Sequence, residues 1–167
     1  MATTYEPIAT TTLGSDTATV TFSSIPGTYT DLVLIIGGNL AVSTNSETIK
    51  FQANSDSNNN YSDTYIYGAG GSATSGRNSN TNAASCGRMG GTNYGGTVIA
   101  HFQNYSNTTT YKTVVGRGSE TNVVWASVGL WRSTSAITSL TVFPELYGSG
   151  TKFKSATVLT LYGIAAA

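Results

Sequence analysis

The side chains with the clearest chemical potential are tyrosines that alternate along one short segment. Tyr61, Tyr65 and Tyr67 have the same parity and lie among Asn and Ser residues, and Asn93 and Tyr94 follow further along the chain. Aromatic rings stack on sugar faces while amides bind hydroxyl groups, so these five residues are candidate contacts for a glycan or a partner protein. The alternative, which the sequence favours, is that the tyrosines are half-buried strand residues or fill a subunit interface, where Tyr is enriched.

Acid–base and metal chemistry has little support in the sequence. His101 is the only histidine, and an ordinary surface or hydrogen-bonded histidine is the simpler interpretation. Asp56 and Asp63 could together hold a calcium ion, but their spacing is not that of an EF-hand, and solvated turn carboxylates are the favoured alternative. The Gly-rich residues 68–71 lack the lysine and the helix of a phosphate-binding loop. We therefore expect a protein that is not an enzyme and has no cofactor and no metal site.

The composition favours association with other proteins and argues against binding to nucleic acid. Only 10% of the 167 residues are charged and the formal net charge is zero, whereas about 25% of residues are charged in an average soluble domain. A neutral, charge-poor surface repels copies of itself only weakly. Eight Lys and Arg offset by eight Asp and Glu leave no basic stripe that could neutralise phosphates.

The expected compartment is a reducing one. Cys86 is the single cysteine, so no internal disulfide can form, which fits assembly in a cytoplasm. Residues 1–6 have neither the basic nor the apolar region of a secretory signal. The longest apolar run, residues 32–36, is too short to span a membrane, so we expect no membrane partner.

The elements that must position the tyrosines are strands. Apolar residues alternate with Thr and Ser, and β-branched and aromatic residues are frequent, while no helical periodicity of any length is present. We expect strands at residues 17–22, 30–36, 48–54, 61–67, 97–105, 112–119, 123–131, 135–143 and 152–164. Short strands separated by turn signals predict one domain over residues 16–167, an antiparallel sandwich or barrel.

Residues 129–143 are the best-patterned part of the chain. They predict a strand, a tight corner at residues 132–134 and a second strand, with Trp131, Ile137 and Leu140 in the core. Near Ser155 and Ala156 a shift of parity predicts a bulge.

Two segments have no such pattern. The Thr-rich residues 1–15 predict an extended arm that becomes ordered only against a neighbour. Residues 68–96, rich in Gly, Ser and Asn, predict a long loop with a short strand at 87–89, and loops of that length are often functional. We expect the function in the arm and in this loop.

Several stretches of the sequence resemble a group of small virion proteins of tailed phages. They are residues 22–26 (FSSIP) with Tyr29 and Leu32, residues 60–61 (NY), residues 130–140 (LWRSTSAITSL) and residues 161–164 (LYGI). Members of this group are jelly-roll-like β domains of marine and cyanobacterial phages, among others, and occur as free-standing virion proteins and as terminal domains of fibres. The resemblance implies a jelly-roll-like β-sandwich and a structural role in the virion.

The composition and the resemblance together predict a non-enzymatic capsid decoration (cement) protein. It would be a homotrimer that binds the major capsid protein or other virion proteins, and its localisation would be the virion, assembled in the host cytoplasm. The alternative is a receptor-binding fibre tip or head fibre that recognises a host surface glycan, and a tail or portal-associated protein is a third possibility. Copy number per virion would separate these functions.

Overall fold

The computed structural model describes residues 4–43 and 46–165, and these residues contain no α-helix. Twelve strands and one short 3₁₀ helix follow one another along the chain. They are β1 (Tyr5–Thr12), β2 (Val20–Phe22), β3 (Asp31–Gly38), β4 (Ser46–Ala53), β5 (Tyr61–Ala69), β6 (Ser72–Thr81), β7 (Ala84–Gly90), β8 (Gly96–Gln103), β9 (Lys112–Ser119), β10 (Val123–Trp131), β11 (Leu140–Pro144), η1 (Tyr147–Ser149) and β12 (Val158–Ile164).

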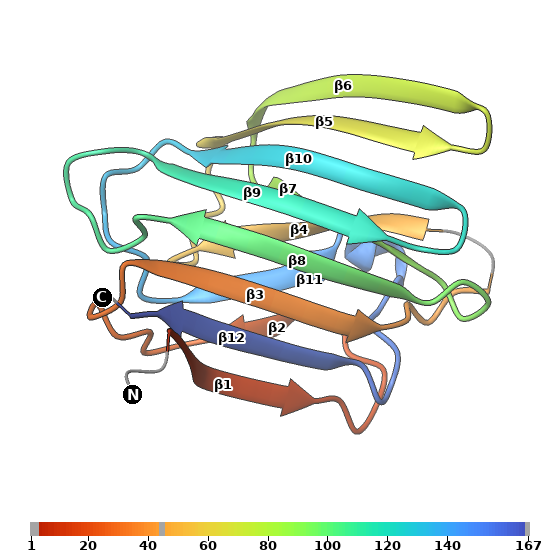
Figure 1. Cartoon of the computed structure of the whole chain (residues 1–167), viewed down its shortest axis with the longest axis horizontal. Coiled ribbons are helices and arrows are strands. Elements are labelled where there is room, and N and C mark those ends of the chain that lie inside the picture. The colour runs from red at the N-terminus through yellow and green to blue at the C-terminus, as the bar shows by residue number, and fades with distance from the viewer. Residues whose placement is uncertain (1–3, 44–45, 166–167) are drawn as a thin grey trace.

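The strands form two antiparallel sheets that pack face to face (Figure 1). The larger sheet has the order β1-β12-β3-β8-β9-β10-β5-β6, and the smaller sheet has the order β2-β11-β4-β7. When the β8–β9 hairpin and the edge strands β1 and β12 are set aside, the orders become β3-β10-β5-β6 and β2-β11-β4-β7. This is the strand order of an eight-stranded jelly roll. The predicted all-β, single-domain, jelly-roll-like sandwich is confirmed.

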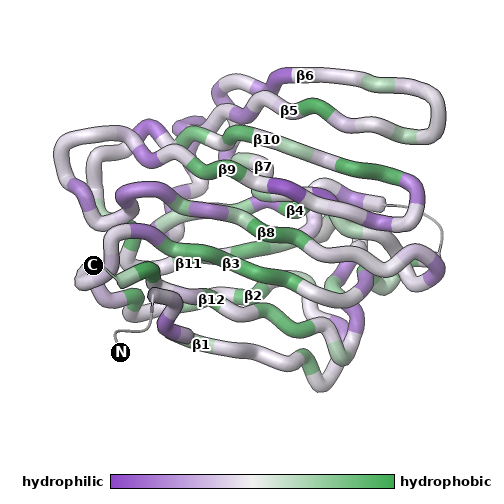
Figure 2. Tube along the Cα trace, viewed as in Figure 1, coloured by the Kyte–Doolittle hydropathy of each residue, from purple (hydrophilic) through white to green (hydrophobic). Residues whose placement is uncertain are grey.

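The core lies between the two sheets and is built by the alternation seen in the sequence. On β3, Leu32, Leu34 and Ile36 point inward and are completely buried. The ring of Phe51 on β4 meets the ring of Phe102 on β8 edge-on, with centroids 5.1 Å apart. Burial of one such side chain contributes about 1.5–3 kcal/mol. Hydrophobic stretches accordingly follow the central strands β3, β8 and β10 of the larger sheet (Figure 2).

Glycines let β7 lie directly on the larger sheet. A Cβ atom on Gly116 of β9 would lie 2.4 Å from the carbonyl oxygen of Cys86, and one on Gly118 would lie 2.3 Å from the carbonyl oxygen of Arg88. Only glycine permits so close a backbone approach. β7 therefore covers β8, β9 and β10 and touches β5 only slightly. As a result the β5–β6 hairpin extends beyond the smaller sheet (Figure 1).

The N-terminal segment is part of the sheet and not an arm. β1 pairs with β12 along most of its length, from Tyr5 opposite Ile164 to Thr12 opposite Val158. The prediction of an extended arm over residues 1–15 is therefore wrong for residues 5–12, and residues 1–3 lie outside the described part of the chain. The Thr-rich segment forms an edge strand because its backbone N–H and C=O groups pair with those of β12. The pattern of side chains in the sequence does not predict this pairing.

The predicted loop at residues 68–96 is also mostly strand. β5 continues to Ala69, and a tight turn with Gly70 in the left-handed region (φ 58°) leads directly into β6. β7 follows, so the strand predicted at residues 87–89 is present but longer. β6 and β7 consist mostly of small residues such as Gly, Ser and Asn. Their sequences therefore lack the alternation of apolar and polar side chains from which a strand is predicted.

The corner at residues 132–134 is present, but the strand after it is shorter than predicted. β10 ends at Trp131, and β11 begins only at Leu140. Between them Ile137 donates its backbone N–H to the carbonyl of Tyr105 (2.9 Å) and has no strand partner. Trp131, Ile137 and Leu140 are buried as predicted. Likewise the irregularity at Ala156 is a turn with positive φ (67°) before β12 and not a bulge inside a strand.

Candidate functional site

A polar pocket of about 240 Å³ lies where the β5–β6 hairpin extends past the edge of the smaller sheet. Its walls come from β4, β5, β6, β7 and β10 and from the turn after β11. The lining residues are Thr48, Lys50, Asp63, Tyr65, Tyr67, Asn78, Arg88, Trp125 and Glu145. The pocket exists because β7 is held against β9 and β10, which leaves the inward face of the hairpin without a covering strand.

Three aromatic rings stack along one wall of the pocket. The ring centroid of Trp125 lies 4.5 Å from that of Tyr65 and 5.5 Å from that of Tyr67, with planes inclined by 19° and 15°. The guanidinium carbon of Arg88 lies 5.6 Å from the Trp125 centroid and 5.9 Å from the Tyr67 centroid, a cation–π arrangement. Arg88 also donates hydrogen bonds to the hydroxyl and the carbonyl of Ser46 (2.8 and 3.1 Å). The guanidinium is thereby fixed against the rings.

A glycine in β6 makes room for the first of these rings. Gly76 is paired with Tyr65 across the hairpin, and a Cβ atom at Gly76 would lie 2.5 Å from the Tyr65 hydroxyl oxygen. Any larger residue at this position would displace the phenol. The position of Tyr65 thus depends on the residue opposite it in β6.

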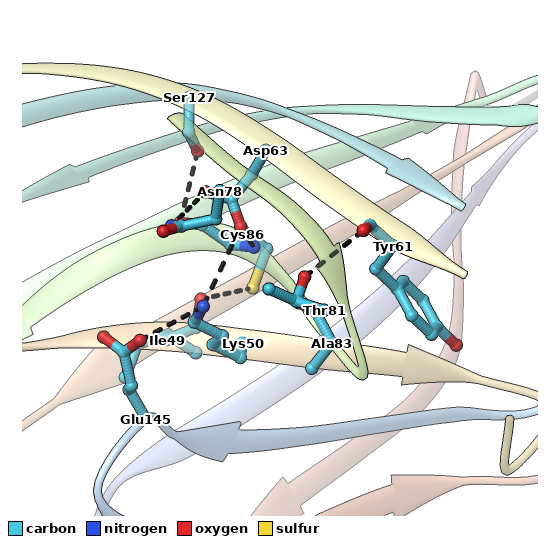
Figure 3. Close-up of polar contacts among 11 residues, drawn as sticks. Ile49, Lys50, Tyr61, Asp63, Asn78, Thr81, Ala83, Cys86, Ser127 and Glu145 are labelled. Carbon is cyan, nitrogen blue, oxygen red and sulfur yellow. Dashed lines mark hydrogen bonds and ion pairs between the residues drawn. The ribbon is translucent and has the colours of Figure 1, made fainter. Parts of the chain in front are cut away.

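Beside the rings lies a chain of charges. Lys50 Nζ is 3.1 Å from Glu145 Oε1 and 3.8 Å from Asp63 Oδ2 (Figure 3). Asp63 also accepts hydrogen bonds from the Asn78 side-chain amide (2.9 Å) and from the backbone N–H of Ser85 (3.0 Å). The side chain of Asp63 is fully buried and that of Glu145 is 43% exposed. The inner carboxylate is therefore a fixed structural charge, whereas the outer one is accessible.

Two of the five tyrosine and asparagine candidates, Tyr65 and Tyr67, line this pocket. Tyr61 lies instead in the core. Its ring is completely buried and stacks on Trp131 (centroids 6.3 Å apart), and its hydroxyl donates to the backbone carbonyl of Asp56 (3.0 Å). Burial raises the pKa of Tyr61. A fully buried ring cannot contact a ligand, so Tyr61 is excluded from the candidate contacts.

Asn93 and Tyr94 lie in the turn between β7 and β8. Asn93 is exposed and Tyr94 is half-buried. The Tyr94 carbonyl accepts a hydrogen bond from the Thr121 hydroxyl in the β9–β10 turn (2.9 Å). Neither residue lines the pocket. The five candidates therefore do not form one site.

Sequence reasoning missed most of the pocket. Alternation within residues 48–54 places Lys50 on the face opposite Ile49 and Phe51, but the pairing of β4 with β7 shifts register between Ile49 and Lys50, and all three residues are buried. Trp125 falls in a predicted strand, yet only its pairing with Tyr67 across β5 and β10 places it beside the tyrosines. The residues missed are Thr48, Lys50, Asn78, Arg88, Trp125 and Glu145.

The remaining titratable candidates have structural contacts. His101 Nε2 lies 2.8 Å from Asp31 Oδ2 on the outer face of the larger sheet. Burial opposes the charge of Asp56, but hydrogen bonds from Asn60 and Trp131 (2.9 and 2.8 Å), with others from the same loop, outweigh it and lower the pKa of Asp56 to about 2. Within residues 4–43 and 46–165, no three His, Cys, Asp or Glu side chains are grouped as metal ligands.

A second surface feature is an apolar patch on the outer face of the larger sheet. Its residues alternate outward on β5, β9 and β10 and are Ile66, Val115, Val124, Ala126 and Val128. The pairs Val128–Val115 and Ala126–Ile66 are direct cross-strand neighbours. Its four larger side chains are between 46% and 66% exposed. Contiguous exposed apolar residues of this kind mark interaction surfaces.

No helix in the described ranges is long and apolar enough to cross a membrane. No protein-family model and no curated protein matches the chain. Among solved structures, the chain is similar to domains LG4–5 of the mouse laminin α1 chain, with 18% identity and a TM-score of 0.33 over 91% of this chain and 40% of that chain. The chain thus spans less than half of that laminin structure.

Two further structures are similar at the same low level. One is a marine PL-14 alginate lyase from Aplysia kurodai, with 10% identity and a TM-score of 0.32 over 86% of this chain and 72% of that one. The other is the enzymatically active domain of tailspike protein 2 of bacteriophage CBA120, with 10% identity and a TM-score of 0.26 over 98% of this chain and 29% of that one. Similarity this low carries no argument about function.

Proposed function

We propose that the protein is a non-enzymatic structural component of a phage virion, and that it decorates the capsid as a homotrimer. The observation that carries the proposal is the apolar patch of β5, β9 and β10, because contiguous exposed apolar side chains on adjacent strands are typical of interaction surfaces. The resemblance of residues 130–140 to phage virion proteins supports the same role.

The patch suits contact between copies of the chain. The exposed Arg117 of β9 lies directly opposite Ala126 on this face, but the whole chain has a formal net charge of zero, so two copies meet without net repulsion. Burying the patch removes from water the apolar surface that each side chain now exposes, at about 25 cal/mol per Å². Several linked copies then bind the major capsid protein through many weak contacts, and multivalency raises the strength of the attachment.

Oligomeric state tests the interface directly. We expect the purified protein to sediment with the mass of three chains, and the double variant Val124→Glu/Val128→Glu to sediment as a monomer with an unchanged circular dichroism spectrum. Leu146→Glu is the matched control, because Leu146 is 47% exposed and lies in the turn after β11, outside the patch. A monomeric wild type, or a double variant that associates like the wild type, would refute the interface.

Virion composition tests the role. Quantitative mass spectrometry of virions is expected to give hundreds of copies of the protein per particle, and capsids that lack it are expected to break at a lower temperature. A handful of copies would instead support the second candidate, a receptor-binding fibre tip or head fibre. The observation that favours this second candidate is the pocket containing Tyr65 and Tyr67.

A further inference from the structure

We propose that the pocket under the β5–β6 hairpin is a binding site for one unit of a neutral saccharide. The proposal does not rest on where the protein lies in the virion, since it concerns the pocket alone. The cavity of about 240 Å³ is smaller than the roughly 300–1,000 Å³ of sites for drug-sized ligands. That size suits a single sugar ring and not a long buried chain.

The charges of the pocket are balanced. Lys50 and Arg88 supply two positive charges, and Asp63 and Glu145 supply two negative ones. An anionic ligand would meet both carboxylates, and a cationic one would meet the ammonium and the guanidinium. A hydroxyl group both donates and accepts, so it can use either kind of charge. The lining therefore favours a neutral, hydroxyl-rich ligand.

The pocket also contains hydrogen-bonding groups without protein partners. The indole N–H of Trp125 is buried and has no acceptor among the described residues. Neither the hydroxyl of Tyr65 nor that of Tyr67 hydrogen-bonds any residue of the described ranges, whereas the buried Tyr61 hydroxyl does. Buried polar groups in folded proteins are normally paired. The hydroxyls of Tyr65 and Tyr67 are not among the buried unpaired atoms of the described residues, so they are open to solvent and can hydrogen-bond a polar ligand in the pocket.

The wall is preorganised for such a ligand. Trp125 packs against both tyrosine rings and against the guanidinium of Arg88, which is itself hydrogen-bonded to Ser46. Because residue 76 is glycine, no side chain at that position displaces the Tyr65 ring. A site that is ordered before binding loses little conformational entropy when the ligand arrives. The exposed carboxylate of Glu145 lies at the opening, where it can accept hydrogen bonds from ligand hydroxyls.

Tryptophan fluorescence measures binding at this position. The chain has two tryptophans, and Trp131 is buried beneath the corner with its N–H bonded to Asp56, so a ligand-dependent change reports on Trp125. The purified full chain is titrated with glucose, mannose, galactose and N-acetylglucosamine, each as its methyl glycoside, and with methyl glucuronoside as the charged counterpart. We expect at least one neutral glycoside to bind at millimolar or lower concentration and the glucuronoside to bind more weakly.

Tyr→Phe variants locate the site, because they remove a single hydroxyl group and leave the packing of the ring unchanged. Tyr67→Phe removes one hydroxyl and is expected to weaken binding of the best neutral glycoside roughly tenfold. Tyr111→Phe is the matched control, because Tyr111 is exposed and lies outside the pocket, and it should bind like the wild type. The proposal is overturned if no neutral glycoside alters the fluorescence, if only the glucuronoside binds, or if Tyr67→Phe binds as tightly as the wild type.

Discussion

Asp56 should stabilise the corner after β10 in a way that depends on its charge. One carboxylate oxygen accepts hydrogen bonds from the backbone and side chain of Asn58 (3.0 and 2.9 Å), and the other accepts from Asn60 (2.9 Å) and Trp131 (2.8 Å). An asparagine at position 56 keeps one acceptor oxygen, but its NH₂ group replaces the second oxygen and cannot accept a hydrogen bond. The Asp56→Asn variant therefore loses about half of these hydrogen bonds.

The size of the loss follows from the hydrogen bonds and the pKa. A hydrogen bond to a charged group contributes about 1.5–3 kcal/mol, but Asp56 is only partly buried and water replaces part of the loss, so we expect Asp56→Asn to cost about 2 kcal/mol at pH 7. The pKa of Asp56 falls from its ordinary 3.8 to about 2 in the folded protein. Discounted for solvent screening, that shift corresponds to about 1 kcal/mol.

The sign of the pH dependence is fixed by the direction of this shift. Because the folded pKa is lowered, the charge of Asp56 contributes its full stability above about pH 4, and the contribution is lost as the pH falls through about 2. Urea unfolding of the wild type and of Asp56→Asn between pH 2 and pH 7 measures the difference. The gap between the two proteins should be constant at higher pH and should narrow by about 1 kcal/mol at the acid end.

Asp16→Asn is the control for a general effect of charge. Asp16 accepts a single hydrogen bond, from the backbone N–H of Ser155 (2.9 Å), and the Asn oxygen can keep it. This control should differ from the wild type by less than about 0.5 kcal/mol. A gap between the wild type and Asp56→Asn that stays the same down to pH 2 would show that the charge of Asp56 does not stabilise the corner.

Three further outcomes test the packing. Gly116→Val should destabilise the fold by at least about 3 kcal/mol in urea, since its Cβ meets Cys86 backbone at 2.4 Å, whereas Gly37→Val, with open space around it, should cost far less. Burial raises the pKa of the Cys86 thiol to about 12, so a disulfide reagent at pH 8 should label it only after unfolding; rapid labelling of the native protein would contradict this. Asp63→Ala should cost about 3 kcal/mol because it removes the acceptor of the buried Ser85 N–H and of the Asn78 amide and leaves Lys50 with Glu145 alone, and a loss no larger than that of Glu145→Ala, whose side chain is exposed, would argue otherwise.

The strands that could be predicted from sequence are those with one buried face. β9 and β10 each have one buried face and one more exposed face, and their β-branched and aromatic residues favour a strand. β6 has small polar residues on both faces, and β1 is a Thr-rich edge strand. Their strand character comes from pairing with β5 and with β12, which no local pattern encodes.

The candidate site was predictable only in part for a related reason. Parity correctly places Tyr61, Tyr65 and Tyr67 on the same face of β5, as their pairing with β10 confirms. The parity of a residue in a strand does not predict which other element packs against that face of the strand. Phe51 packs against Tyr61 (centroids 5.9 Å apart) and makes it a core residue, while Tyr65 and Tyr67 lie beyond the edge of the smaller sheet.

The sequence by itself determined that the protein is a β-sandwich, that Trp131 and Leu140 are core residues, and that the tyrosines of β5 face one way. Only the tertiary structure decided which of those tyrosines meet a pocket. The reason is the close approach of β7 to Gly116 and Gly118, which leaves the β5–β6 hairpin uncovered and gathers Lys50, Arg88 and Trp125 beside it. Side chains from five strands meet there through contacts that span much of the chain.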